Sequence, residues 1–273
     1  MRIPDNDSVS RDVLIIDVTD RCNYSCPWCG GISDIKNTWD NAQVDLFKQH
    51  IKRFRYGTYS FHGGEPLVDM NLVEQLTAII REQQPKAIIR LFTNGTLLTD
   101  GVVAFIKRYD IYTVISAQAT GYKNAVQLLE FYNNPAQFLE TLNTLPHVSL
   151  RYVWNMRSNL KADITLLSKI FNCHIEVTPD HHKLSQLTVE HVKQLEEVIR
   201  YSKNNLSTTF DVLHSLSHCC DCRASRRRFF TDGFIGWEGD VPTEIINGCA
   251  MFHAKMDKSV YEEYKKLSEE VKK

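Results

Sequence analysis

The chain carries three cysteines on one short loop, and their spacing suits metal chemistry. Cys22, Cys26 and Cys29 form a C-x3-C-x2-C pattern directly after an apolar run at residues 13–18 that is typical of a strand. A closed structural zinc site and a fully protein-ligated iron–sulfur cube each take four protein ligands. Three thiolates on one loop therefore indicate a cluster with one iron left open, where chemistry can occur. The alternative is half of a zinc site that cysteine or histidine elsewhere completes.

Two glycine-containing segments follow the next strand-like runs. A Gly-Gly-Glu segment at 63–65 comes after the run at 58–62, and Thr-Asn-Gly at 93–95 closes the run at 87–93. Paired glycines let the backbone pass close to a ligand, and a carboxylate complements an ammonium group. Either pair alone would indicate only a turn. Because all three motifs follow strands, parallel pairing would bring them to the same edge of a sheet.

In this order the three motifs closely resemble those of the radical S-adenosylmethionine (radical SAM) enzymes. The resemblance implies that Cys22, Cys26 and Cys29 hold a [4Fe–4S] cluster whose open iron binds S-adenosylmethionine. It also implies a one-electron donor such as flavodoxin or ferredoxin, because one electron splits the cofactor to methionine and a 5′-deoxyadenosyl radical. The cofactor-binding residues implied in the same way are Trp28, Gly63, Gly64, Glu65, Asn94, Ser116 and Asn155.

Several of these assignments compete with simpler interpretations. Trp28, which the resemblance puts against the adenine, could serve packing alone, and Asn94 could be an ordinary turn residue. Ser116 ends the fourth predicted strand, but the residues after it depart from the Asp-Gly pair that is frequent in the family. Near the end of the fifth strand, Asn155 is favoured over Arg151, which would lie deep in the strand.

A second group of cysteines lies late in the chain. The segment at 228–237 predicts a β-hairpin that turns at Asp232-Gly233. It resembles the opening of the SPASM or twitch extensions, which bind auxiliary iron–sulfur clusters, although Trp237 and Glu238 stand where those extensions normally place a cysteine. One auxiliary cluster, a structural zinc and free thiols remain as alternatives, and the candidate ligands are Cys220, Cys222, Cys249 and Cys219.

The pattern of the chain predicts an α/β fold. Short apolar runs alternate with amphipathic stretches up to about residue 205, which is typical of β/α units around a parallel sheet. Together with the resemblance, this predicts a partial (β/α)6 TIM-like barrel at 1–205, followed by a small cysteine-containing extension at 206–273. The predicted strands are 13–18, 58–62, 87–93, 111–116, 148–154 and 174–177. The predicted helices are 42–54, 72–83, 101–109, 125–132 with an extension toward 143, 163–171 and 188–203.

Composition sets the expected surroundings of the protein. Of the 273 residues, 43% are hydrophobic and 24% are charged, and the formal net charge is −1, so no global field attracts nucleic acid or an anionic membrane. We expect neither a signal peptide nor a membrane span, because the first residues are polar and no apolar run approaches ~20 residues. The eight cysteines favour metal ligation in a reducing cytoplasm over disulfides.

The substrate is the least determined prediction. The hairpin and the late cysteines favour a peptide or protein side chain, whereas the arginines at 223 and 226–228 favour a nucleic-acid base or nucleotide. The polar residues at 180–182, which follow the sixth predicted strand, could contact a substrate or form an ordinary loop. A third hypothesis is a non-catalytic iron–sulfur or zinc-binding protein, which Gln118 in place of an acidic residue supports.

Overall fold

The computed structural model describes residues 13–24, 39–118, 132, 134–154, 156–179, 186–205, 210–211, 226–229, 235–237, 259, 263 and 266. Nine strands form one sheet, and six of them, β1 to β6, are parallel neighbours in chain order. These are β1 (Val13–Thr19), β2 (Thr58–Gly63), β3 (Ile88–Thr93), β4 (Tyr112–Gln118), β5 (His147–Trp154) and β6 (His174–Pro179). All six strands expected from the sequence are therefore present.

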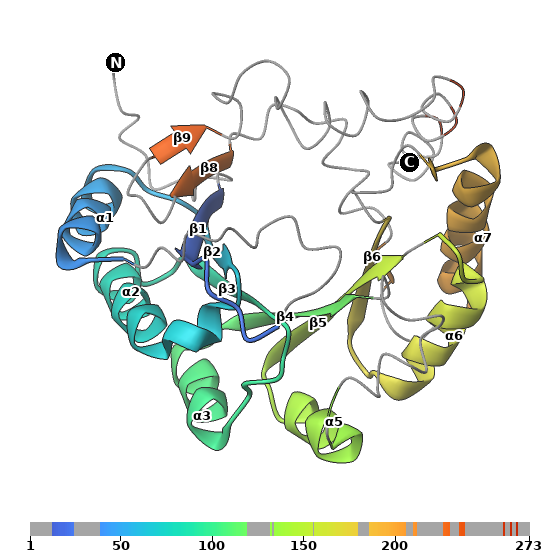
Figure 1. Ribbon diagram of the computed structural model, residues 1–273, viewed down its shortest axis with the longest axis horizontal. Helices are drawn as coiled ribbons and strands as arrows, with labels where there is room; N and C mark the ends of the chain where they lie inside the picture. Colours follow the sequence, from blue (N-terminus) through green and yellow to red (C-terminus); the bar gives the residue numbers. More distant parts are fainter. Residues whose placement is uncertain are drawn as a thin grey trace.

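The helices follow the strands and cover one side of the sheet. Figure 1 shows a strongly curved, open sheet with the helices arranged along its convex side, as in a partial barrel. The expected α/β fold class is confirmed, and the sheet is not closed. The helices are α1 (Asn41–Arg53), α2 (Met70–Gln83), α3 (Asp100–Tyr109), α5 (Pro135–Asn143), α6 (Leu160–Ile170) and α7 (Val189–Asn205), and a short 3₁₀ helix, η1 (Pro66–Asp69), precedes α2.

Capping residues explain where these helices begin. The side chain of Asp40 accepts from the backbone N–H of Gln43, whose own side chain accepts from the backbone N–H of Asp40, which forms a capping box at α1. Asp69 and Thr99 accept in the same way at the first turns of α2 and α3. Each helix then packs apolar residues, such as Phe47 in α1, against the sheet.

Strand alternation divides the sheet into an apolar and a polar face. On β5, the Tyr152 hydroxyl donates to Asp163 of α6 at 2.7 Å, so Tyr152 points toward the helices. Its neighbour Arg151 must then point to the concave face, because successive side chains alternate. The convex face is buried and apolar, with Leu14, Ile16, Phe61, Ile89, Leu91, Leu150 and Ile175 each at most 1% exposed.

The segment after residue 205 contributes strands to both edges of this sheet. At one edge β7 (Phe210–Asp211) pairs in parallel with β6, and at the other β8 (Arg226–Phe229) pairs in parallel with β1. The expected hairpin is present as the antiparallel pair β8–β9, where β9 is Ile235–Trp237, and its predicted turn lies outside the described residues. Neither β7 nor the β1–β8 pairing was predicted from the sequence. The division at residue 205 stays a prediction.

Candidate cofactor site at the carboxyl ends of the strands

The loops after β1 and β2 are joined by their backbones. The N–H of Gly64 donates to the carbonyl of Thr19 at 2.7 Å, and the N–H of Glu65 donates to the carbonyl of Arg21 at 2.9 Å. A Cβ on Gly63 would stand 2.4 Å from the Thr19 oxygen, and one on Gly64 would stand 2.3 Å from the Arg21 oxygen. Gly63 also has φ +121°, a conformation that side chains disfavour. Both glycines are therefore required for the approach of the two loops.

Glu65 joins the loop after β2 to the loop after β3. One carboxylate oxygen accepts from the Thr93 hydroxyl at 2.8 Å and from the backbone N–H of Leu67 at 3.1 Å, and the other accepts from the N–H of Asn94 at 2.7 Å. The residue is 1% exposed, and this burial raises the pKa of its carboxyl although the three hydrogen bonds act in the opposite direction. These donors occupy three of about four acceptor positions of the carboxylate, so one position is left for a ligand.

Asn94 connects the third loop to the cysteine loop. Its side-chain amide donates to Oδ1 of Asn23 at 2.9 Å, and its carbonyl accepts from the Tyr132 hydroxyl at 3.0 Å. Asn23 in turn donates to the Thr96 hydroxyl at 2.8 Å. The three loops that carry the sequence motifs thus contact one another pairwise at one edge of the sheet.

Cys22 lies at the base of this arrangement. It follows β1 directly, is half-buried, and its Sγ accepts from the backbone N–H of Tyr24 at 3.4 Å. The other predicted ligands and contacts of the cofactor, Cys26, Cys29, Trp28 and Asn155, lie outside the described residues, and so do the late cysteines Cys219, Cys220, Cys222 and Cys249. Within the described ranges, no three histidine, cysteine or acidic residues gather as a metal site. The ligand sets therefore stay predictions.

The concave face of β4 to β6 carries a second group of polar residues. Ser116 lies two positions before the end of β4, because the strand continues to Gln118, and it pairs in register with Arg151. Nε and Nη2 of Arg151 both donate to one oxygen of Glu176 on β6, at 3.1 and 2.9 Å. The same guanidinium lies 4.5 Å from the ring centre of Phe92. Arg151 is therefore engaged deep in the strand, as the sequence suggested.

Sequence reasoning missed the other members of this polar layer. The Phe92 ring also stacks on His62, with ring centres 4.0 Å apart, and His62 makes a hydrogen bond of 2.9 Å with Ser60. The signal was present as alternation, since Ser60 and His62, like Ser149 and Arg151, are polar residues two positions apart in otherwise apolar strands. The strands were predicted from their apolar positions alone, so the polar face was not recognised.

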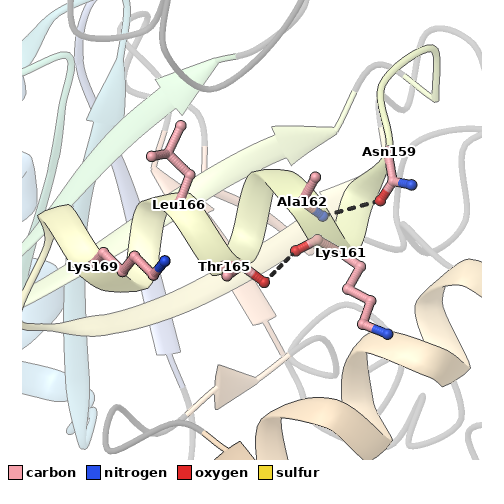
Figure 2. Close-up of a pocket in the computed structure, with 6 residues that line it drawn as sticks. All are labelled: Asn159, Lys161, Ala162, Thr165, Leu166 and Lys169. Carbon is pink, nitrogen blue, oxygen red and sulfur yellow. Dashed lines mark hydrogen bonds between the residues drawn. The ribbon is translucent and has the colours of Figure 1, made fainter.

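Two hollows lined by described residues lie away from these loops. Figure 2 shows a shallow one of about 450 Å³ along α6, lined by Asn159, Lys161, Ala162, Thr165, Leu166 and Lys169. A second, of about 220 Å³, lies between α5 and the segment before β6, and Cys173 lines it. Burial raises the pKa of the Cys173 thiol to about 11, which agrees with a packing role for this residue. Neither hollow touches the motif loops.

The comparisons with known proteins agree with this geometry. The sequence pattern of the Radical SAM superfamily matches residues 16–157, just over half of the chain. This chain belongs to the radical SAM superfamily. It is therefore a radical SAM enzyme, and the family implies a [4Fe–4S] cluster and S-adenosylmethionine as its cofactors. In the part of the chain that the structure describes, no helix is both long and apolar enough to cross a membrane.

Relatives of this radical SAM enzyme differ in their activities. The match to a GTP 3′,8-cyclase of Mycolicibacterium smegmatis covers 81% of this chain and 72% of the cyclase, with 24% identity. An uncharacterized protein of Methanocaldococcus jannaschii is 27% identical over 161 residues, and there this chain spans about half of the relative, 52%. Streptococcus suis SuiB bound to S-adenosylmethionine shares the fold, with a TM-score of 0.62, 16% identity, and coverage of 94% of this chain and 68% of SuiB.

Proposed function

We propose that this enzyme uses a [4Fe–4S] cluster held by Cys22, Cys26 and Cys29 to abstract hydrogen from a peptide or protein side chain. The observation that carries the proposal is the pairwise joining of the three motif loops through Gly64, Glu65 and Asn94. When bound, the cluster supplies one electron to S-adenosylmethionine and so generates a 5′-deoxyadenosyl radical.

The chain's own residues have defined tasks in this proposal. Cys22 presents a thiolate at the carboxyl end of β1, and Gly63 and Gly64 keep the second loop close to it. Glu65 holds this loop to the third one, and its remaining acceptor position takes the cofactor's ammonium group. Trp28 against the adenine, with Ser116 and Asn155 as further contacts of the cofactor, completes the proposed site.

The polar concave face supports a substrate position beside the cofactor. Arg151, Glu176, His62 and Phe92 occupy successive parts of that face, below the edge where the motif loops lie. Because the charge of Arg151 is balanced by Glu176, this layer suits a neutral or zwitterionic group better than a polyphosphate. SuiB, which shares the fold, has also been solved with the precursor peptide SuiA. Both observations favour a peptide substrate.

A nucleotide is the second candidate substrate. The observation in its favour is the similarity to GTP 3′,8-cyclases, which reaches 34% identity over 98 residues in the protein of Parasynechococcus marenigrum. In either case we propose a flavodoxin or ferredoxin as electron donor and a reducing, cytoplasmic setting. The auxiliary iron–sulfur cluster, with zinc as its alternative, also stays a proposal for Cys219, Cys220, Cys222 and Cys249.

The test is cleavage of S-adenosylmethionine by the reconstituted enzyme. Under anaerobic conditions with iron, sulfide and dithionite, the wild type is expected to form 5′-deoxyadenosine and Cys26→Ala to form none. Cys173→Ala is the matched control, because this cysteine lies outside the motif, and it is expected to keep the activity. A loaded, cofactor-bound enzyme without product, with peptides and with GTP added, would favour the non-catalytic hypothesis.

The same assay separates the two substrate classes. Product formation that rises with a peptide pool and not with GTP supports the peptide proposal. Product formation that rises only with GTP, followed by loss of GTP in the nucleotide chromatogram, would replace it with the nucleotide alternative. Salt dependence adds a check, since contacts to phosphates weaken steeply with ionic strength.

A further inference from the structure

Asn23, the residue after the first cysteine, is hydrogen-bonded to the loop after β3. Asn23 uses both ends of its side-chain amide, since Nδ2 donates to the Thr96 hydroxyl at 2.8 Å and Oδ1 accepts from Asn94 at 2.9 Å. Both partners belong to the loop after β3, more than 70 positions further along the chain. A side chain with two such distant partners restricts the loop that carries it.

The partners of Asn23 are themselves held in place. Oδ1 of Asn94 accepts from both the backbone N–H and the hydroxyl of Thr96, at 3.0 and 2.6 Å, which closes a tight local turn. The backbone of Asn94 is anchored through its N–H to Glu65 and through its carbonyl to Tyr132. Asn23 is therefore attached to a fixed part of the molecule.

The residue before Cys22 is tethered as well. Arg21 gives its carbonyl to the N–H of Glu65, and its guanidinium pairs with Asp69 at 3.1 Å. Cys22 thus lies between two tethered residues, Arg21 and Asn23, one attached to the second loop and the other to the third. Its thiol is presented from a backbone that is restrained on both sides.

We propose that Asn23 is a positioning residue that clamps the cysteine loop to the loop after β3 and so orients the Cys22 thiol before any metal arrives. The clamp acts through Cys22 and is not a ligand itself. It rests on the proposed function in one respect, namely that Cys22 ligates the cluster. Its physical benefit is preorganisation, because a ligand already held in place loses less conformational freedom when metal binds.

The first experiment measures the clamp in the metal-free protein. The alkylation rate of Cys22 by iodoacetamide is followed by peptide mass spectrometry, together with hydrogen exchange of residues 20–24. Asn23→Ala removes both hydrogen bonds of the clamp, and Thr96→Val removes one of them. Thr96→Val is expected to raise the alkylation rate about fivefold, the effect of losing one net hydrogen bond, and Asn23→Ala is expected to raise it by at least that factor. Thr96→Ser keeps the hydroxyl and is expected to stay within about twofold of the wild type.

Two further variants keep this result specific. Asn143→Ala, at an exposed asparagine at the end of α5, is the matched control and is expected to change nothing. The double variant Asn23→Ala/Thr96→Val should match Asn23→Ala, because Asn23→Ala already removes the contact with Thr96. Equal Cys22 reactivity in the wild type and in Asn23→Ala would overturn the clamp, and so would additive effects in the double variant.

The second experiment follows the clamp into the loaded enzyme. In Asn23→Ala and Thr96→Val, the electron paramagnetic resonance signal of the reduced cluster should be broadened, and KM for S-adenosylmethionine should rise more than kcat falls. Thr96→Ser should restore both. If the wild type never cleaves S-adenosylmethionine, the proposed function fails while the thiol-reactivity result still decides the clamp. If the wild type is active and the variants are indistinguishable from it, only the clamp fails.

Discussion

The two halves of the sheet build their polar ends differently. At β1 to β3, the loops contact one another directly. Backbone atoms join the first two loops where glycines allow the closest approach, and the side chains of Glu65 and Asn23 join them to the third. At β4 to β6, the described polar contacts are made by side chains within the strands, with the Arg151–Glu176 pair as the main one. A site built from loops in close contact needs particular residues at particular positions, whereas a site built from side chains within the strands can be varied strand by strand. The first half therefore suits a constant cofactor, and the second suits a substrate that differs among enzymes.

The largest expected effect breaks the backbone contacts of the first half. In Gly64→Ala the new methyl would meet the carbonyl oxygens of Arg21 and Asp20 at 2.3 and 3.0 Å, so one loop must move. We expect a loss of about 3 kcal/mol in the free energy of unfolding, measured by urea denaturation, and loss of S-adenosylmethionine binding. Gly101→Ala is the control, because the nearest atom would be 3.9 Å away, and it should be neutral or stabilising by up to ~1 kcal/mol. A Gly64→Ala variant that is stable and still binds the cofactor would show that the first half of the sheet does not depend on this close loop contact.

A second variant tests the carboxylate that joins the loops. In Glu65→Gln an amide N–H₂ replaces one of the two oxygens that accept from Thr93 and Asn94, so a donor would face a donor. We therefore expect the metal-free protein to lose about 1–3 kcal/mol in the free energy of unfolding. The raised pKa of Glu65 determines how the free energy of unfolding changes with pH. A raised folded-state pKa gives a stability contribution that is full below the unfolded value and is lost as pH rises through the folded value.

The pH series therefore has a defined sign. The difference in unfolding free energy between the wild type and Glu65→Gln should shrink from pH 5 to pH 8, because only the wild type titrates at this position. The affinity of the wild type for S-adenosylmethionine should instead increase with pH, because the carboxyl of Glu65 ionises. The affinity of Glu65→Gln should not change with this ionisation. A stability difference that grows with pH would contradict the assigned burial of the carboxylate.

The smallest effect is expected in the second half, from a side-chain pair. Arg151→Met leaves Glu176 without this cation, and since the arginine side chain is 25% exposed we expect a loss of about 1–2 kcal/mol in unfolding free energy. Glu176→Gln should cost about 1 kcal/mol, because the amide oxygen still accepts from Arg151. Arg151→Met combined with Glu176→Leu should recover part of the loss, as measured in a double-mutant cycle that includes Glu176→Leu alone. Strictly additive losses would show that the pair is not coupled.

The same contrast explains what the sequence could predict. The meeting of the segments around Cys22, Glu65 and Asn94 at one edge of the sheet could be predicted, because glycines and a polar residue directly after an apolar run leave a visible pattern. The six parallel strands followed from their apolar runs. Glu176 and His62 were not found, because a polar residue in a strand shows its partner only when the register between strands is known. The β1–β8 pairing was missed for a similar reason, since the arginines at 226–228 give no apolar signal.

The pairing of β1 with β8 also bears on how the chain folds. Val13 is aligned with Arg226, so β1, the strand that leads into Cys22, pairs with a strand about 200 residues later in the chain. This contact is very non-local. During synthesis one edge of β1 therefore stays unpaired until residues 226–229 have emerged, and an unpaired edge can pair wrongly with another chain. We therefore expect slow folding, and we expect aggregation when the late strands are weakened. Iron delivered before β8 joins the sheet would reach Cys22 while β1 is paired on one edge only.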